Sequence, residues 1–211
     1  MRPFRLAVLA LVAALPVQAQ TRFSFAPQIG LYIPTEKLQS LATGNANAVD
    51  SLEGGISFGA RLGATFGNHL GLLFSGNYVP TTYKFGAQSS GLLQQDAKLF
   101  TGAGQLMVFI LPITSPVTLF LSGGVGVINR GGAAFSQAAK KRYITGVFGA
   151  GAGLRLGGIG LSVGADLYNY NADYIGTTLN TNKLKQKDVH LKFGFGVPFG
   201  VAQRAASAKT N

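Results

Sequence analysis

Large apolar side chains alternate with small or polar side chains in eight separate stretches of the chain. The last stretch, residues 188–199, shows the pattern most clearly, because every odd position from Val189 to Phe199 is large and apolar. A period of two is typical of a β-strand that has one apolar and one polar face. The eight predicted strands are residues 22–34, 54–66, 70–79, 97–111, 117–128, 143–156, 159–168 and 188–199.

The connections between these strands alternate between long and short. Long polar segments are expected at 35–53, 80–96, 129–141 and 169–187, and short ones at 67–69, 112–116 and 157–158. Gly157-Gly158 has the composition of a two-residue hairpin turn. Strands of about ten residues suit a tilted crossing of an apolar band about 25 Å tall, and an even number of strands returns both ends to one side. The pattern predicts an all-β fold, an eight-stranded antiparallel up-and-down barrel.

The composition of the polar faces decides between a soluble and a transmembrane barrel. A soluble barrel of the lipocalin kind would turn these faces to water and would carry many Lys, Glu, Asp and Gln side chains there. The chain instead has 30 glycines and only 12% charged residues. Small polar residues suit a narrow lumen, and a closed barrel satisfies its own backbone in lipid. We therefore expect the apolar faces to contact lipid and the polar faces to line the lumen.

The beginning of the chain has the layout of a secretory signal peptide. Arg2 and Arg5 precede an apolar run at 6–15, and small residues lead to Ala19. We expect cleavage after Ala19, a barrel domain at 20–199 and a short polar tail at 200–211. Beyond the signal, no stretch approaches the roughly 18 apolar residues that a membrane helix needs.

Charge and composition narrow the function classes. The formal charge is +11, and loss of Arg2 and Arg5 with the signal leaves +9. The aromatic side chains lie on the apolar faces rather than among the lysines, which favours an anionic membrane surface over nucleic acid as the partner. The chain has no cysteine, and its two histidines are far apart in sequence. No metal site, cofactor or G-x-G-x-x-G nucleotide motif is therefore expected.

The closing strand, V-H-L-K-F-G-F-G-V-P-F, ends on the aromatic residue Phe199. With the pattern of residues 23–199, it resembles the eight-stranded outer-membrane barrels of Gram-negative-type bacteria, the OmpA-like and OmpX-like group. The resemblance implies an outer-membrane location, periplasmic short turns, external long loops, and Phe199 as an assembly signal for the barrel-assembly machinery. Two departures are Pro198, just before the aromatic residue, and the polar tail that follows it.

Several charged and polar residues fall on the faces expected to line the lumen. The predicted lumen polar network comprises Arg61, Gln105, Arg155, Asp166, Asp188, His190 and Lys192, with Asn77 and Tyr168 beside it. An eight-stranded barrel leaves room for little more than side chains, which favours a packed plug, and the alternative is a proton or solute path. Asp166 and Lys192 are expected to pair, since they lie at similar heights on neighbouring strands.

The inward glycines of residues 143–156 are expected to make room for bulky side chains such as Tyr168 and Arg61. They are Gly149, Gly151 and Gly153.

Two of the long loops are basic. Their cations, predicted to form a basic loop surface, are Arg130, Lys140, Lys141, Arg142, Lys183, Lys185 and Lys187. Scattered solvated charges are the simpler interpretation. If the loops are external, however, each cation contributes about 1 kcal/mol beside anionic head groups. We hypothesise that they bind lipopolysaccharide phosphates or another acidic surface polymer.

The sequence therefore favours a structural or surface-interaction role in the envelope. Lipid A deacylases and palmitoyltransferases exist on such barrels, but they need a histidine with a nearby nucleophile or acid facing lipid. His190 is predicted to point inward without a nearby serine and His69 to lie in a turn, so we expect no catalysis. The alternative function is a narrow pore or transporter for small or hydrophobic solutes. Closure places Pro27 and Pro198 in one seam, the expected weakest join.

Overall fold

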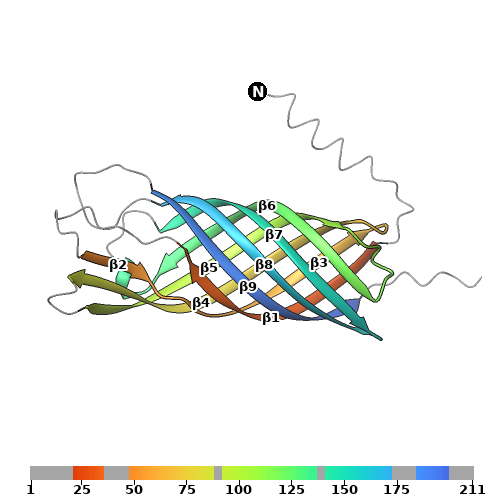
Figure 1. Cartoon of the computed structure of the whole chain (residues 1–211), viewed down its shortest axis with the longest axis horizontal. Helices are drawn as coiled ribbons and strands as arrows, with labels where there is room; N and C mark the ends of the chain where they lie inside the picture. Colours follow the sequence, from red (N-terminus) through yellow and green to blue (C-terminus); the bar gives the residue numbers. More distant parts are fainter. Residues whose placement is uncertain (1–20, 36–47, 88–91, 137–140, 173–183, 200–211) are drawn as a thin grey trace, which may run out of the picture.

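The computed structural model describes residues 21–35, 48–87, 92–136, 141–172 and 184–199. The expected signal peptide at 1–19 and polar tail at 200–211 lie outside these residues. The described strands are β1 (Thr21–Pro34), β2 (Ala48–Leu52), β3 (Gly55–Phe66), β4 (Leu70–Ala87), β5 (Leu93–Phe109), β6 (Val117–Gly131), β7 (Arg142–Leu156), β8 (Ile159–Ala172) and β9 (Leu184–Phe199). They form one elongated barrel of tilted strands (Figure 1).

The barrel is antiparallel throughout and closes through its two terminal strands. β1 pairs with β9 from Phe23↔Phe199 to Pro34↔Asp188, as the sequence predicted. β3 pairs with the first part of β4, and β2 pairs with the last part of the same strand. Only Glu53 and Gly54 separate β2 from β3. β2 therefore extends β3, and the barrel has eight strands, which confirms the predicted fold.

Two of the short connections are tight turns that depend on glycine. Gly67 links β3 to β4 with a φ of 62°, and Gly157 links β7 to β8 with a φ of 61°. Glycine adopts positive φ without the steric cost that other residues incur. Both turns lie where the sequence predicted them.

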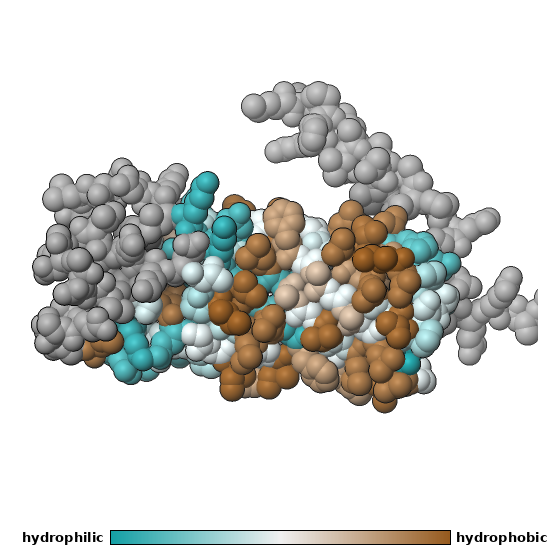
Figure 2. All heavy atoms as spheres, in the orientation of Figure 1, coloured by the Kyte–Doolittle hydropathy of each residue, from teal (hydrophilic) through white to brown (hydrophobic). Residues whose placement is uncertain are grey.

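Exposed apolar side chains lie on the outward face of each of the eight barrel strands. Figure 2 shows part of the belt that they form, on one side of the barrel. Phe193 on β9 is 51% exposed, whereas the neighbouring His190 is fully buried in the lumen. On β1 the belt runs from Phe23 to Ile33, about 33 Å along a strand at ~3.3 Å per residue. At a tilt of about 40° this spans about 25 Å of the barrel axis, the height of the apolar band of a membrane barrel. The predicted orientation of the two faces is confirmed.

The predicted long loops are wrong in extent, because the strands continue beyond the belt. β2 lies inside the predicted loop 35–53, β4 and β5 extend into 80–96, β6 into 129–141, and β8 and β9 into 169–187. In this region several apolar side chains turn inward, beside the buried polar residues Arg130 and Asp188. Val79, Leu99 and Ile128 point inward and are fully buried, whereas Lys98 points outward and is exposed. The strands therefore continue past the belt, where the inward face carries both apolar and polar side chains.

A single turn of 3-10 helix, η1 (Ala133–Phe135), follows β6. Its Phe135 is buried and packs among the side chains that fill this end of the lumen. In the part of the chain that is described, no helix is long and apolar enough to span a membrane.

Candidate functional site

An ion pair lies in the middle of the lumen, between β8 and β9. The β8–β9 register places Asp166 opposite His190, two residues from Lys192, and Lys192 Nζ donates a hydrogen bond to Asp166 Oδ2. Gln105 reaches the same carboxylate from β5, with its Nε2 atom 3.4 Å from Asp166 Oδ1 and 3.3 Å from Ser122 Oγ. The ion pair expected from the sequence is present, and Gln105 connects it to β6.

Two further sets of hydrogen bonds cross the lumen. Gln28 on β1 donates to Asn77 on β4, and Asn77 Nδ2 donates to Thr101 Oγ1 on β5 at 3.2 Å. Arg61 on β3 donates to Ser162 Oγ on β8. The sequence-based network omitted Gln28, although its position on the polar face of β1 would have included it.

His190 is a packed lumen residue. Its ring centroid lies 5.1 Å from that of Tyr32 and 4.9 Å from that of Tyr168. Neither of its ring nitrogens has a hydrogen-bond partner among the described residues. The other histidine, His69, lies at the turn after β3, with its Nδ1 atom 2.9 Å from the carbonyl oxygen of Phe109.

Arg130 was predicted to belong to the basic loop surface, and this is wrong. The side chain is 3% exposed, and its Nη2 atom donates to the Tyr170 hydroxyl at 2.5 Å. Its guanidinium also lies over three rings, 5.7 Å from Phe135 and 5.4 Å from both Tyr143 and Tyr170. Tyr170 donates in turn to Asp188 Oδ2 at 2.7 Å. Even positions of β6 face inward, so continuing the strand past Ile128 would have placed Arg130 in the lumen.

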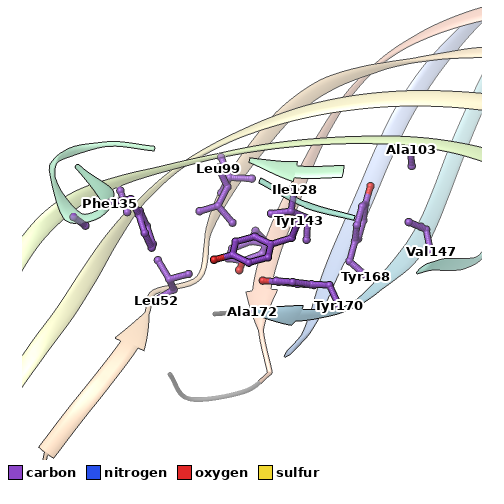
Figure 3. Close-up of a cluster of buried hydrophobic side chains, with 14 residues drawn as sticks. Leu52, Leu99, Ala103, Ile128, Phe135, Tyr143, Val147, Tyr168, Tyr170 and Ala172 are labelled. Carbon is purple, nitrogen blue, oxygen red and sulfur yellow. The ribbon is translucent and has the colours of Figure 1, made fainter. Parts of the chain in front are cut away.

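Apolar and aromatic side chains form a buried cluster at the same end of the lumen (Figure 3). The cluster comprises Tyr32, Leu52, Val79, Ala97, Leu99, Ala103, Ile128, Ala134, Phe135, Tyr143, Val147, Tyr168, Tyr170 and Ala172. The sequence predicted a plug of hydrogen bonds and ion pairs. In the structure the polar network occupies the middle of the lumen, and this cluster packs the end away from the short turns.

Arg155 does not join the predicted polar network. It lies at the end of β7, is exposed, and its backbone N–H donates to the Pro116 carbonyl oxygen at 2.7 Å. It is one of the residues that line a cavity of about 500 Å³ at the short-turn end of the lumen. Arg155 occupies an inward-facing position of β7, but it lies too close to the end of the strand to reach the polar network.

The inward glycines of β7 do make room for other side chains, but not for the ones expected. A Cβ on Gly151 would come within 2.5 Å of Phe120 Cζ, and one on Gly153 within 2.6 Å of Thr118 Oγ1. At Gly149 a Cβ would collide with Asp166 and Ser122. Arg61 instead lies beside Gly194 on β9, where a Cβ would be 2.8 Å from its Nη2 atom.

Basic side chains stand on the outer wall just beyond the apolar belt. Arg142 precedes Ile144 on the outward face of β7, and Lys185 and Lys187 precede Val189 on that of β9; all three cations are exposed. We call these three residues the basic rim. Lys98 on β5 has a similar outward position, which the sequence analysis missed because it treated Lys98 as part of the membrane crossing.

Lys141 is exposed, and its Nζ atom donates to the Ser136 carbonyl oxygen at 3.2 Å. Lys140 and Lys183 lie outside the described residues. Phe199 ends β9, where its backbone is paired with Phe23.

The closed barrel, with its outward apolar belt and inward polar network, defines the class of fold, that of the eight-stranded bacterial outer-membrane barrels. The chain is similar to the outer membrane protein OprG from Pseudomonas aeruginosa, with a TM-score of 0.60 and 12% identity over 86% of this chain and 97% of that one. It is also similar to the E. coli outer membrane protein W, with a TM-score of 0.51 and 15% identity over 87% and 100% of the two chains.

A third similar structure is Neisserial surface protein A, with a TM-score of 0.50 and 17% identity over 84% of this chain and 97% of that one. At these identities the likeness is one of fold. No protein-family model matches the sequence, and no curated protein matches it significantly. The fold is thus shared with outer-membrane proteins, and the site must be interpreted from its own residues.

Proposed function

We propose that this protein supports the outer membrane as a closed barrel and contacts lipopolysaccharide phosphates through its basic rim. The position of Arg142, Lys185 and Lys187 carries the proposal, because they are exposed directly beyond the apolar belt. With the long connections external, as in the barrels that the sequence resembles, the rim lies at the level of the outer-leaflet head groups. A cation near such a surface contributes about 1 kcal/mol.

The proposed route to the membrane is export followed by barrel assembly. The N-terminal pattern that ends at Ala19 supports export. The closing strand, with Phe199 paired to β1, supports recognition by the barrel-assembly machinery. The role requires no catalysis, and the packing of His190 between two tyrosine rings supports a structural part for that histidine.

The alternative, a narrow pore or transporter, is less well supported. Val79, Leu99, Ile128 and Val147 are fully buried in the lumen, and the polar network lies below them. We expect the folded protein to give no steady ion conductance in a planar bilayer. Stable single-channel steps from the folded protein would favour the pore.

Lipopolysaccharide binding by a charge-neutral variant tests the proposed contact. We expect Lys185→Gln/Lys187→Gln to bind lipopolysaccharide about 30-fold more weakly, from ~1 kcal/mol per lost cation. Binding is measured with the folded protein in nanodiscs of zwitterionic lipid. Lys185→Arg/Lys187→Arg keeps both charges at the same positions and should leave the affinity unchanged. Equal affinities for the wild type and the Lys185→Gln/Lys187→Gln variant would contradict the proposal.

A further inference from the structure

The cavity at the short-turn end of the lumen has one apolar wall. β4, β5 and β6 supply Leu73, Met107, Phe109 and Phe120 to its lining. Met107, Phe109 and Phe120 belong to one buried cluster, and the two phenylalanine rings meet edge to face with centroids 6.2 Å apart. This wall offers contact area to an apolar group that enters from the short-turn end.

The cavity also has a cationic lining. Arg22, Arg61 and Arg155 line the cavity, and no acidic residue does. Among the described residues neither Arg22 nor Arg155 forms an ion pair, and the side chain of Arg61 donates to Ser162. Asp166 in the adjoining network already pairs with Lys192. The cavity therefore holds positive charge that the described side chains do not neutralise.

We propose that this cavity binds a single-chain amphiphile with an anionic head group, either a carboxylate or a phosphate. The planar fork of an arginine matches both head groups. The alkyl chain would lie along Met107, Phe109 and Phe120. A volume of about 500 Å³ falls in the range of small-molecule sites, which are mainly apolar with a few placed polar groups. This site lies at the end opposite the basic rim and does not depend on the lipopolysaccharide proposal.

A single methionine gives a local probe of the cavity. Met1 and Met107 are the methionines of the chain, so in the mature protein after signal removal a methyl-labelled methionine reports on Met107. The mature barrel in zwitterionic nanodiscs is titrated with dodecanoate and, separately, with dodecyl phosphate. We expect a saturable shift of the Met107 methyl resonance with at least one of them, and the lower half-saturation concentration identifies the head group. Dodecanol should need at least about tenfold more ligand.

Two variants test the proposed site, one by removing arginines and one by filling the cavity. Arg61→Gln/Arg155→Gln should raise the half-saturation concentration by at least about tenfold, because it removes the head-group partners. Gly160 on β8 lines the cavity, and a Cβ there would have its closest contact at 3.7 Å, so Gly160→Phe can fill the space. This variant should abolish the saturable shift. The matched control is Gly76→Phe on the lipid face of β4, where a Cβ meets nothing within 4 Å; it should bind as the wild type does.

Four results would contradict the proposed site or its proposed ligand. A shift that never saturates, or saturation unchanged in Gly160→Phe, would overturn the site. Equal binding of dodecanol would overturn the requirement for an anionic head group, and equal binding of inorganic phosphate would overturn the amphiphile. Gel mobility with and without boiling establishes that every variant is folded, so loss of the fold cannot imitate loss of the site.

Discussion

Arg130 shows how the lumen holds a cation out of water. Its guanidinium donates to Tyr170, which donates to Asp188, so one phenol connects a buried cation to a buried carboxylate. Asp188 is 1% exposed, and three aromatic rings surround the cation. Removing one partner of such a buried pair destabilises a fold, because the remaining charge carries an uncompensated desolvation cost.

Removal of this cation should therefore destabilise the barrel strongly. We expect Arg130→Met to lower the free energy of unfolding by about 3 to 5 kcal/mol. Adding Asp188→Asn should recover part of the loss, since the carboxylate is then neutral. The measurement is a urea titration in lipid vesicles, followed by gel mobility without boiling. Arg142→Met, on the exposed face of β7, is the control and should change stability by less than about 0.5 kcal/mol. A further loss on adding Asp188→Asn would contradict the coupling.

Single contacts could be predicted where the strand register was secure. Asp166 and Lys192 lie on neighbouring strands within the clearly alternating region, and their ion pair follows from the register. Arg130 and Tyr170 could not be placed, because both predicted strands ended too early and left them in loops. The contact between them needs two distant strands to extend past the belt, which hydrophobic alternation alone does not indicate.

The seam between β1 and β9, which closes the barrel, contains an interruption in its strand pairing. Pairing runs from Phe23 to Phe25, is interrupted at Ala26 and Pro27, and resumes at Gln28 opposite Gly194. Proline has no N–H to donate, and Pro198 on the partner strand has the same defect. By contrast, β3 and β4 pair without interruption from Phe58 to Phe66.

We expect amide exchange to be faster at the seam than in the β3–β4 hairpin. The exchange rates compared are those of the backbone amides from Phe25 to Gln28 on β1 and from Leu62 to Thr65 on β3. Local opening at the seam breaks fewer backbone hydrogen bonds than opening in the hairpin. Hydrogen exchange of the folded barrel, read by NMR, measures it directly. Pro27→Val should slow exchange at the seam by restoring a donor. Equal exchange rates in the two regions would show that the seam is not a weak join.

Over the whole molecule, the barrel changes character along its axis. An apolar belt surrounds the middle, a packed aromatic end lies beyond it, and a hollow cationic end lies at the short turns. The sequence was sufficient to predict the belt, because period-two alternation reports directly which face meets lipid. It was not sufficient for the packed end, where apolar side chains also face inward, or for the cavity, whose lining comes from several strands.

Spin labels on β9 test most directly whether the outward face of the barrel contacts lipid. The chain has no cysteine, so single-cysteine variants at 189–193 can each be labelled cleanly. We predict that labels at Val189, Leu191 and Phe193 collide with oxygen dissolved in the bilayer, and that labels at His190 and Lys192 are shielded from both oxygen and a water-soluble nickel chelate. Collision of the chelate with the labels at Leu191 and Phe193 would contradict the membrane barrel.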